Sequence, residues 1–224
     1  MKLEGKIIDF LGDSITEGVG VKDIANNRYD HILEKECGLK AVYNYGIGGT
    51  RLAHQSVPSE KPRHDLCFCG RAYDLNRDAD IIVVYGGIND FIHGDAPIGK
   101  KGDRTPATFC GAVWFLMNLL RQNYVDKTVV FMTPAHCCFN GLTDRKPSDR
   151  PMKKEDAMPV LGYVEIIQET AKEFDIPVLD LYHTLGIDPN LEEDCIKYTV
   201  DGLHFNDDGH HVLAKTLKNF LESL

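Results

Sequence analysis

Short runs of apolar, mostly β-branched residues recur along the chain, and polar or glycine-rich positions bound each of them. The clearest run, residues 81–85, reads Ile-Ile-Val-Val-Tyr without a break, which is typical of a strand buried on both faces of a sheet. Four further runs have the same character and also indicate strands. The pattern predicts five strands, over residues 7–11, 41–45, 81–85, 128–132 and 176–180.

Between these runs, apolar residues recur every three or four positions, which is the spacing of one face of a helix. Helices are predicted over residues 24–37, 66–77, 108–124, 157–174 and 208–224. Gly38 is a fitting stop for the first helix, and Pro159 confines the fourth to the residues that follow it. Residues 93–106 and 134–156 are polar and are predicted to be long loops.

The alternation of strands and helices predicts an α/β domain in which helices cover both faces of a parallel sheet. The 224 residues suffice for one sizeable core. No repeat, low-complexity segment or linker divides the sequence, so residues 1–224 are expected to form a single domain.

Composition and charge exclude several classes of partner. The formal net charge of −9 argues against nucleic acid and anionic membrane surfaces. No apolar stretch reaches the length of a membrane span. The amino-terminal residues have no signal-peptide core, so the chain as given is expected to be cytoplasmic, or secreted if a leader was removed. The sequence leaves the oligomeric state open.

Seven cysteines are present, an odd number, and their arrangement does not resemble a disulfide framework. Cysteine and histidine could together suggest a metal site, but their spacings match none of the usual zinc patterns. The residues considered were Cys67, Cys69, Cys137, Cys138, His64 and His136. We therefore expect free or buried thiols, and neither a metal nor a cofactor.

Ser14 lies where the first predicted strand ends and a helix is about to begin. A serine there exposes its hydroxyl at the carboxyl edge of the sheet, with its N–H at the positive end of a helix. This position suits a nucleophile. Ser14 and Glu17 also fit a capping box, in which the serine caps the helix and the glutamate reaches back to it.

Ligands of open parallel sheets bind at the carboxyl ends of the strands. Four unusual segments lie at or near such ends, namely residues 12–14, 46–50, 87–90 and 201–204. Together they supply a hydroxyl, a glycine backbone, a side-chain amide and an Asp/His pair. These are the groups that acyl transfer requires.

The four segments read Gly-Asp-Ser, Gly-Gly-Thr, Gly-Ile-Asn-Asp and Asp-x-x-His, in that order. In this the chain resembles the SGNH hydrolases, also called the GDSL esterase and lipase superfamily. Two departures are visible: Ile15 replaces the leucine of the name motif, and Phe205 stands where the family often has proline. Neither removes a reacting atom. The resemblance implies a three-layer, flavodoxin-like α/β/α fold and an ester hydrolase.

The resemblance also assigns roles. Ser14 would be the nucleophile, His204 the general base and acid, and Asp201 the residue that orients the imidazole. The oxyanion hole would consist of the N–H groups of Ser14 and Gly49 and the amide of Asn89, with Gly48 as a rival for Gly49.

Other interpretations of single residues remain open. Asn89 could be a turn residue and Asp201 a turn cap. Asp90 is expected to anchor loops and Asp13 to order the first helical turn. Of the remaining histidines, three could line the pocket and two are expected to lie on the surface or pack. These are His93, His136 and His183 in the first group, and His210 and His211 in the second.

A nucleotide- or phosphate-binding module is a rival of a different class, since such modules also place a glycine-bearing loop after a strand. Neither G-x-G-x-x-G nor the P-loop pattern occurs, however, and the Asp/His pair would be unexplained. A non-catalytic binding domain is a further alternative, and turnover of a simple ester would decide it.

The substrate is less well defined. The two long loops carry cations and few large apolar residues; the cations are Lys100, Lys101, Arg104, Arg145, Lys146 and Arg150. If these loops stand over the site, they favour short acyl groups on a polar alcohol, such as an acetylated carbohydrate. The alternatives are a lipase or thioesterase acting on longer acyl chains, and a basic loop that is merely solvated.

Overall fold

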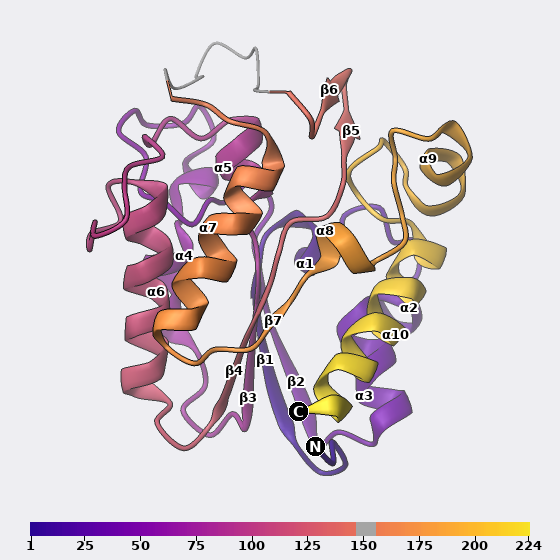
Figure 1. Ribbon diagram of the computed structural model, residues 1–224. Helices are drawn as coiled ribbons and strands as arrows, with labels where there is room; N and C mark the ends of the chain where they lie inside the picture. The colour runs from indigo at the N-terminus through magenta and orange to yellow at the C-terminus, as the bar shows by residue number, and fades with distance from the viewer. Residues whose placement is uncertain (147–155) are drawn as a thin grey trace.

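The computed structural model describes residues 1–146 and 156–224 and contains a five-stranded, wholly parallel sheet at its centre (Figure 1). The strands lie in the order β2-β1-β3-β4-β7, which is the flavodoxin-like order once the hairpin strands β5 and β6 are set aside. Their bounds are β1 Ile7–Gly12, β2 Ala41–Gly46, β3 Ile81–Tyr85, β4 Thr128–Met132 and β7 Val178–Leu179.

Helices cover both faces of the sheet (Figure 1). One layer contains α4 (Phe68–Arg71), α5 (Ile88–Ile92), α6 (Phe109–Asn123) and α7 (Val160–Glu173). The other contains α2 (Ile24–Asn27), α3 (Tyr29–Cys37) and α10 (Asp207–Ser223). Successive residues of β3 enter opposite cores: Ile82 and Val84 pack under α6 and α7, and Ile81 and Val83 pack under α3 and α10. All five residues of β3 are buried, as the unbroken apolar run predicted.

The predicted fold class is confirmed, but two predicted helices are wrong in detail. The helix over 24–37 is broken at Arg28, whose backbone is extended (φ −72°, ψ 134°). Its guanidinium donates to both carboxylate oxygens of Asp30, at 2.7 and 2.8 Å, which a continuous helix would not position. The helix over 66–77 shrinks to α4 and a 3₁₀ turn, Ala72–Asp74, because Leu75 is extended and the Asn76 N–H donates to the buried Asp9.

Several short elements had no clear signal in the sequence. They are α8 (Leu181–Thr184), α9 (Glu192–Tyr198), a 3₁₀ turn at Pro62–Asp65, and the hairpin β5 (Cys138–Phe139) and β6 (Leu142–Thr143). The hairpin lies within the predicted loop 134–156. Of that loop, residues 147–155, including Arg150, lie outside the described residues. The fifth strand is shorter than predicted because Asp180 already caps α8.

In the two described ranges, no helix combines the length and the apolar character needed to cross a bilayer. The seven cysteines all lie in these ranges and are free thiols, with Cys69 and Cys137 buried.

Candidate active site

Ser14 is the first residue of α1 (Ser14–Glu17), directly beyond the carboxyl end of β1. The residue that caps this helix is Asp13, whose Oδ1 accepts a hydrogen bond from the Ile15 N–H at 3.1 Å. The interpretation of Ser14 as the cap is therefore wrong, and its hydroxyl is available for other contacts. Gly12 makes the tight turn possible, because a Cβ there would overlap the side chain of Thr16.

A chain of hydrogen bonds joins Ser14 to the last of the four motif segments. The Nε2 atom of His204 lies 2.9 Å from the Ser14 Oγ, and its Nδ1 lies 2.7 Å from the Asp201 Oδ2. The other Asp201 oxygen accepts the backbone N–H groups of His204, at 2.8 Å, and of Leu203, at 3.1 Å. A carboxylate that accepts from Nδ1–H leaves Nε2 able to accept the serine proton.

The Asp201 carboxyl is held in its charged form. Burial alone would raise its pKa, but the hydrogen bonds from the His204 ring and from two backbone N–H groups bring the pKa below its usual value. The hairpin packs beside this turn: the Cys138 N–H donates to the Gly202 carbonyl at 2.8 Å, and the Phe139 ring meets the His204 ring edge-on.

The glycine loop after β2 lies against Ser14. The Gly48 N–H donates to the Glu17 carboxylate at 2.7 Å, so it is already engaged. By contrast, the N–H groups of Gly49 and Ser14 have no acceptor among residues 1–146 and 156–224. Gly49 has a φ of +79°, and the His64 ring lies where its Cβ would be, so only glycine fits here.

Asn89 lies at the start of α5, immediately beyond β3, and is buried. Its Nδ2 donates to the Thr50 carbonyl at 3.1 Å and to the Asp13 carboxyl at 3.3 Å. Its Oδ1 lies 3.0 Å from the His93 Nε2. Ser14, Gly49 and Asn89 thus lie just beyond the carboxyl ends of β1, β2 and β3, which are neighbours in the sheet.

Neighbouring acidic residues have structural functions, as expected. Asp90 accepts the N–H groups of Leu52 and Ala53, at 2.9 and 3.0 Å, and so anchors the chain after the glycine loop. Asp13 orders the first turn of α1, and burial raises the pKa of its carboxyl to about 6.

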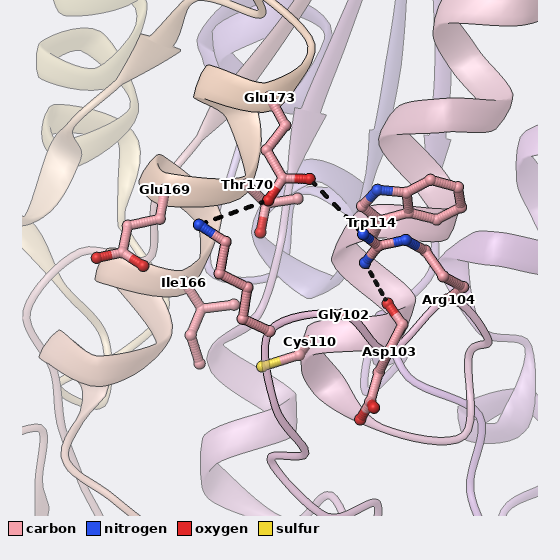
Figure 2. A pocket seen from close by; sticks show the side chains of 10 residues that line it. Gly102, Asp103, Arg104, Cys110, Trp114, Ile166, Glu169, Thr170 and Glu173 are labelled. Atoms are coloured by element: carbon pink, nitrogen blue, oxygen red, sulfur yellow. Dashed lines mark hydrogen bonds and ion pairs between the residues drawn. The ribbon is translucent and has the colours of Figure 1, made fainter.

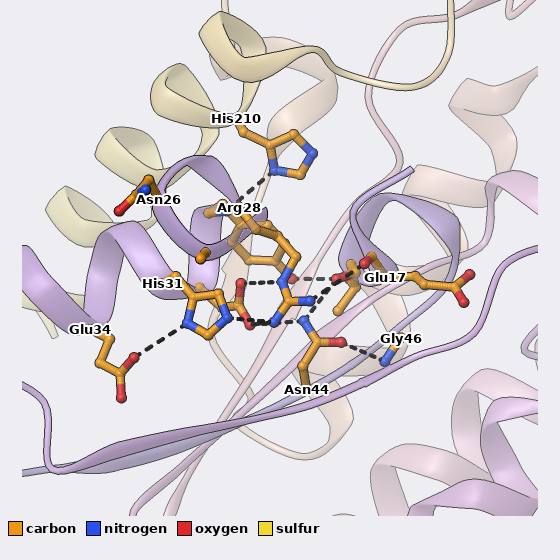
Figure 3. Close-up of polar contacts among 12 residues, drawn as sticks. Glu17, Asn26, Arg28, His31, Glu34, Asn44, Gly46 and His210 are labelled. Atoms are coloured by element: carbon orange, nitrogen blue, oxygen red, sulfur yellow. Dashed lines mark hydrogen bonds and ion pairs between the residues drawn. The ribbon is translucent and has the colours of Figure 1, made fainter. Parts of the chain in front are cut away.

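A polar network centred on Asn44 in β2 connects α1 to β2 and α3 (Figure 3). Asn44 donates to the Thr16 carbonyl at 2.7 Å and to Asp30 at 2.8 Å, and it accepts the Gly46 N–H at 2.9 Å. The polar groups at the end of α1 and in β2 are therefore bonded to each other, which fixes the helix that carries Ser14.

Sequence reasoning missed two buried arginines, Arg71 and Arg51, that support the site. Arg71 donates to the carbonyls of Gly12 and Tyr45 and to the Thr50 hydroxyl, and so ties together the ends of β1 and β2 and the glycine loop. Burial lowers the pKa of its guanidinium to about 10. Arg51 contacts His93. No local pattern marks these residues, because the partners that tie them to the site lie 21 to 59 positions away.

The other candidate histidines do not join this cluster. His136 pairs with Asp144, and His183 pairs with Asp180 at 2.8 Å. His210 is buried and accepts the Tyr29 N–H at 3.3 Å, whereas His211 is exposed on α10.

We expected the cations of the long loops to gather over Ser14, but Lys101, Arg104 and Arg145 contact other parts of the structure. Lys101 and Arg104 line a small pocket of about 100 Å³ beside α6 and α7 (Figure 2). Both approach Glu173, at 3.8 and 4.0 Å, and Arg104 stacks on Trp114. Arg145 pairs with Asp188 at 2.6 Å, while Lys100 and Lys146 are exposed. Long side chains reach carboxylates and aromatic faces that the loop sequence does not reveal.

The comparison with protein families agrees with this geometry. The profile of the GDSL-like lipase/acylhydrolase family, a family of ester hydrolases, matches residues 10–212. The chain belongs to the GDSL-like lipase/acylhydrolase family. The resemblance based on the four sequence blocks is thus confirmed. No curated protein matches the chain.

Solved structures share the fold over nearly the full chain. A protein from Lactobacillus plantarum is 29% identical with a TM-score of 0.81, and the match covers 98% of each chain. A possible lipase from Chitinophaga pinensis is 18% identical with a TM-score of 0.69, covering 97% of this chain and 98% of that one. A two-domain esterase active on acetylated mannans is 20% identical with a TM-score of 0.61, covering 99% of this chain and 50% of that one.

Proposed function

We propose that the chain is a serine esterase that cleaves carboxylic esters through an acyl-enzyme. The observation that carries this proposal is the continuous hydrogen-bond chain from Asp201 through His204 to Ser14. It ends at Ser14, whose backbone N–H, like that of Gly49, bonds to no described residue. A hydroxyl, an oriented imidazole and unengaged donors are the groups that acyl transfer needs.

The first half of the reaction follows from these positions. The Ser14 Oγ bonds to the ester carbonyl carbon while its proton passes to His204 Nε2, and the carbonyl electron pair moves onto oxygen. The N–H groups of Ser14 and Gly49 and the Asn89 amide stabilise that oxyanion. When the carbonyl re-forms, the bond to the alcohol breaks, and His204 returns the proton to the departing oxygen.

Water completes the cycle. It attacks the acyl-enzyme carbonyl while giving a proton to His204, and the second collapse releases the carboxylic acid and restores the Ser14 hydroxyl. Throughout, Asp201 keeps the imidazole in the Nδ1–H tautomer and stabilises it when it is charged. The Asn89 amide nitrogen already donates to Thr50 and Asp13, so one of these bonds must break when it donates to the oxyanion. The longer bond, 3.3 Å to Asp13, is the one that breaks.

Short acyl groups on a polar alcohol are the substrates we favour. The His64 ring lies directly on Gly49, so it limits the room beside the proposed oxyanion donors. Burial and the nearby cations Arg51, Lys61 and Arg63 lower the pKa of His64, which keeps the ring neutral and able to hydrogen-bond a hydroxylated substrate. The structural neighbour active on acetylated mannans is consistent with this class.

Longer acyl chains are the second candidate, and a specific feature favours them. An apolar cavity of about 410 Å³ lies between α4, the loop 105–107 and α6, lined by His54, Cys67, Tyr73 and Phe115 among others. Its first lining residue, His54, follows Thr50 by four positions in the sequence. Its volume falls within the usual range of small-ligand sites.

Two measurements test the proposal. A serine-directed fluorophosphonate should label Ser14, and Ser14→Ala should abolish both labelling and hydrolysis of p-nitrophenyl acetate while the protein stays folded. Labelling of a cysteine instead, or full activity in Ser14→Ala, would refute the serine mechanism. A panel of p-nitrophenyl esters from two to twelve carbons, followed by acetylated oligosaccharides, then decides between the short-chain and long-chain candidates.

A further inference from the structure

His93 uses both nitrogens of its ring inside the structure. Its Nε2 lies 3.0 Å from the Asn89 Oδ1, and its Nδ1 lies 2.9 Å from a guanidinium nitrogen of Arg51. His93 follows Asn89 by four residues, just after α5, so both groups are carried by the same short turn. The ring therefore lies between a buried cation and the side-chain amide that we propose as an oxyanion donor.

The partners determine which ring nitrogen carries the proton. An arginine guanidinium can only donate, so the His93 Nδ1 must accept and cannot hold a hydrogen. A neutral imidazole carries its single hydrogen on the other nitrogen, so Nε2–H donates to the Asn89 carbonyl oxygen. This fixes the Asn89 oxygen toward His93 and leaves its Nδ2 toward Thr50 and Asp13, the residue that precedes Ser14.

Arg51 is itself anchored. Its side chain is only 3% exposed, and it donates to the Asp65 Oδ1 at 2.7 Å and to the Ser59 Oγ at 2.9 Å. The second Asp65 oxygen accepts the Ser59 N–H at 2.9 Å, which closes the loop around the arginine. The series Asp65–Arg51–His93–Asn89 thus links the hydrogen-bonded loop at Ser59 and Asp65 to the amide.

The orientation of this amide matters most during turnover. If the Asn89 amide rotated by half a turn, its oxygen would face the Thr50 carbonyl, the Asp13 carboxyl and the developing oxyanion, all of which only repel it. Thr50 and Asp13 resist that rotation at rest. Once Nδ2 turns from Asp13 to an oxyanion, one of these restraints is lost, whereas the bond from His93 to Oδ1 is unaffected.

From this geometry we infer that His93 is a positioning residue, which Arg51 and Asp65 hold as an Nε2–H donor so that the Asn89 amide presents its nitrogen to the oxyanion. The inference rests on the proposed function and extends it by three residues that the family motifs do not include. His93 touches no reacting atom, so its effect should appear in kcat and leave KM almost unchanged.

The kinetic experiment compares His93→Leu, His93→Gln and His183→Leu on p-nitrophenyl acetate, with thermal unfolding to confirm that each variant is folded. His93→Leu should lose about tenfold in kcat, the effect of one hydrogen bond. His93→Gln, which can donate an amide N–H at the same place, should recover most of that loss. His183→Leu is the control: it removes a histidine that is paired with Asp180, outside the series, and it should retain full activity.

The second measurement needs no turnover. Nitrogen-15 spectra of the unsubstituted protein at pH 7, with His93 assigned through the His93→Gln variant, should show the Nε2–H tautomer of a neutral ring. An Nδ1–H tautomer or a doubly protonated ring at His93 would overturn the inference, as would unchanged kcat in His93→Leu. Ser14→Ala separates a failure of the proposed function from a failure of the positioning role. If the unsubstituted protein hydrolyses the ester and Ser14→Ala does not, the proposed function stands, and unchanged kcat in His93→Leu counts only against the role of His93. If the unsubstituted protein does not hydrolyse the ester, the proposed function fails, and a role for His93 in that reaction falls with it.

Discussion

The carboxylate of Glu17 accepts the N–H of Gly48 at 2.7 Å, and its other oxygen pairs with Arg63 at 2.6 Å. Glu17 thus holds the peptide that precedes Gly49, rather than closing a capping box on its own helix. Since the Gly48 N–H is taken in this way, the next N–H, that of Gly49, is the one we assign to the oxyanion hole.

Glu17→Ala should therefore lower kcat by about tenfold, because a hydrogen bond to a charged acceptor contributes roughly 1.5–3 kcal/mol and only part of that reaches the transition state. Glu17→Gln keeps an acceptor and should retain most of the activity. Arg63→Met should have a small effect, since the ion pair that it breaks is largely exposed. Steady-state kinetics on a short ester test all three. Wild-type kcat in Glu17→Ala would mean that Gly49 needs no such support.

Asn89→Ala should reduce kcat by ~10²–10³ with little change in KM, since its amide would act on a charge that develops only in the transition state. Asn89→Asp should be at least as damaging, because a carboxylate repels the oxyanion. Kinetic measurements over a range of ester concentrations separate the two constants. A raised KM with normal kcat would instead make Asn89 a substrate-binding residue.

Asp201→Asn should lower kcat by roughly 10²–10⁴-fold. The N–H groups of His204 and Leu203 would keep the amide oxygen in the place of Oδ1, so the amide nitrogen would face the His204 Nδ1. The His204 Nδ1 would then have to accept a hydrogen bond from the amide, so the ring hydrogen would move to Nε2. A protonated Nε2 cannot take the serine proton. Kinetics and nitrogen-15 spectra of His204 provide the check. Activity close to the unsubstituted level would show that Asp201 is not the third member.

His210 should make the folded state sensitive to mild acid. Burial lowers the pKa of its imidazole to about 4 from a usual 6.5, so between these values the unfolded chain binds a proton that the folded chain does not. Stability is therefore fully present above pH 6.5 and is lost as the pH falls toward 4, by about 2 kcal/mol at pH 5. His210→Asn keeps an acceptor for the Tyr29 N–H without titrating. The free energy of unfolding in urea should fall between pH 7.5 and pH 5 by about 2 kcal/mol less in this variant than in the unsubstituted protein.

Asp9 should act in the opposite direction. Burial raises the pKa of its carboxyl to about 7, and its Oδ1 is buried without a partner among the described residues. The unfolded chain releases this proton near pH 4 and the folded chain only near 7, so stability falls as the pH rises through that window. Asp9→Asn, which can still accept the Asn76 N–H, should stabilise the protein at pH 8 by about 2–4 kcal/mol and not at pH 4. Denaturant midpoints of both proteins at pH 4 and pH 8 test this. A variant that is less stable than the unsubstituted protein at pH 8 would contradict the prediction.

The sheet was predictable from the sequence because strand formation has a local signal. The β3 run is apolar at every position, and the other four strands also showed as apolar runs. The break at Arg28 was not predictable, because its cause is a contact with Asp30 and α1 that periodicity does not record. Elements of two to seven residues, such as β5, β6 and α9, are too short for a periodic pattern to form.

The site divides in the same way. Ser14, Asn89, Asp201 and His204 lie in compact motifs, and the structure brings all four together. Their supporting residues were invisible, because the bonds of Arg51 to His93 and of Arg71 to Gly12 span 42 and 59 positions. Lys101 and Arg104 show the converse: charge alone placed them over the site, and an acidic partner on α7 holds them elsewhere.

The hydrogen bond between Ser14 and His204 spans 190 residues of chain. On a ribosome that adds about 5–20 residues per second, the serine is made on the order of 10–40 s before its partner. Throughout that interval the nascent chain carries an unactivated hydroxyl, and it cannot attack the esters around it. Under the proposed function, turnover can therefore begin only after residues 201–204 have been made and the His204 ring has docked against the Ser14 hydroxyl.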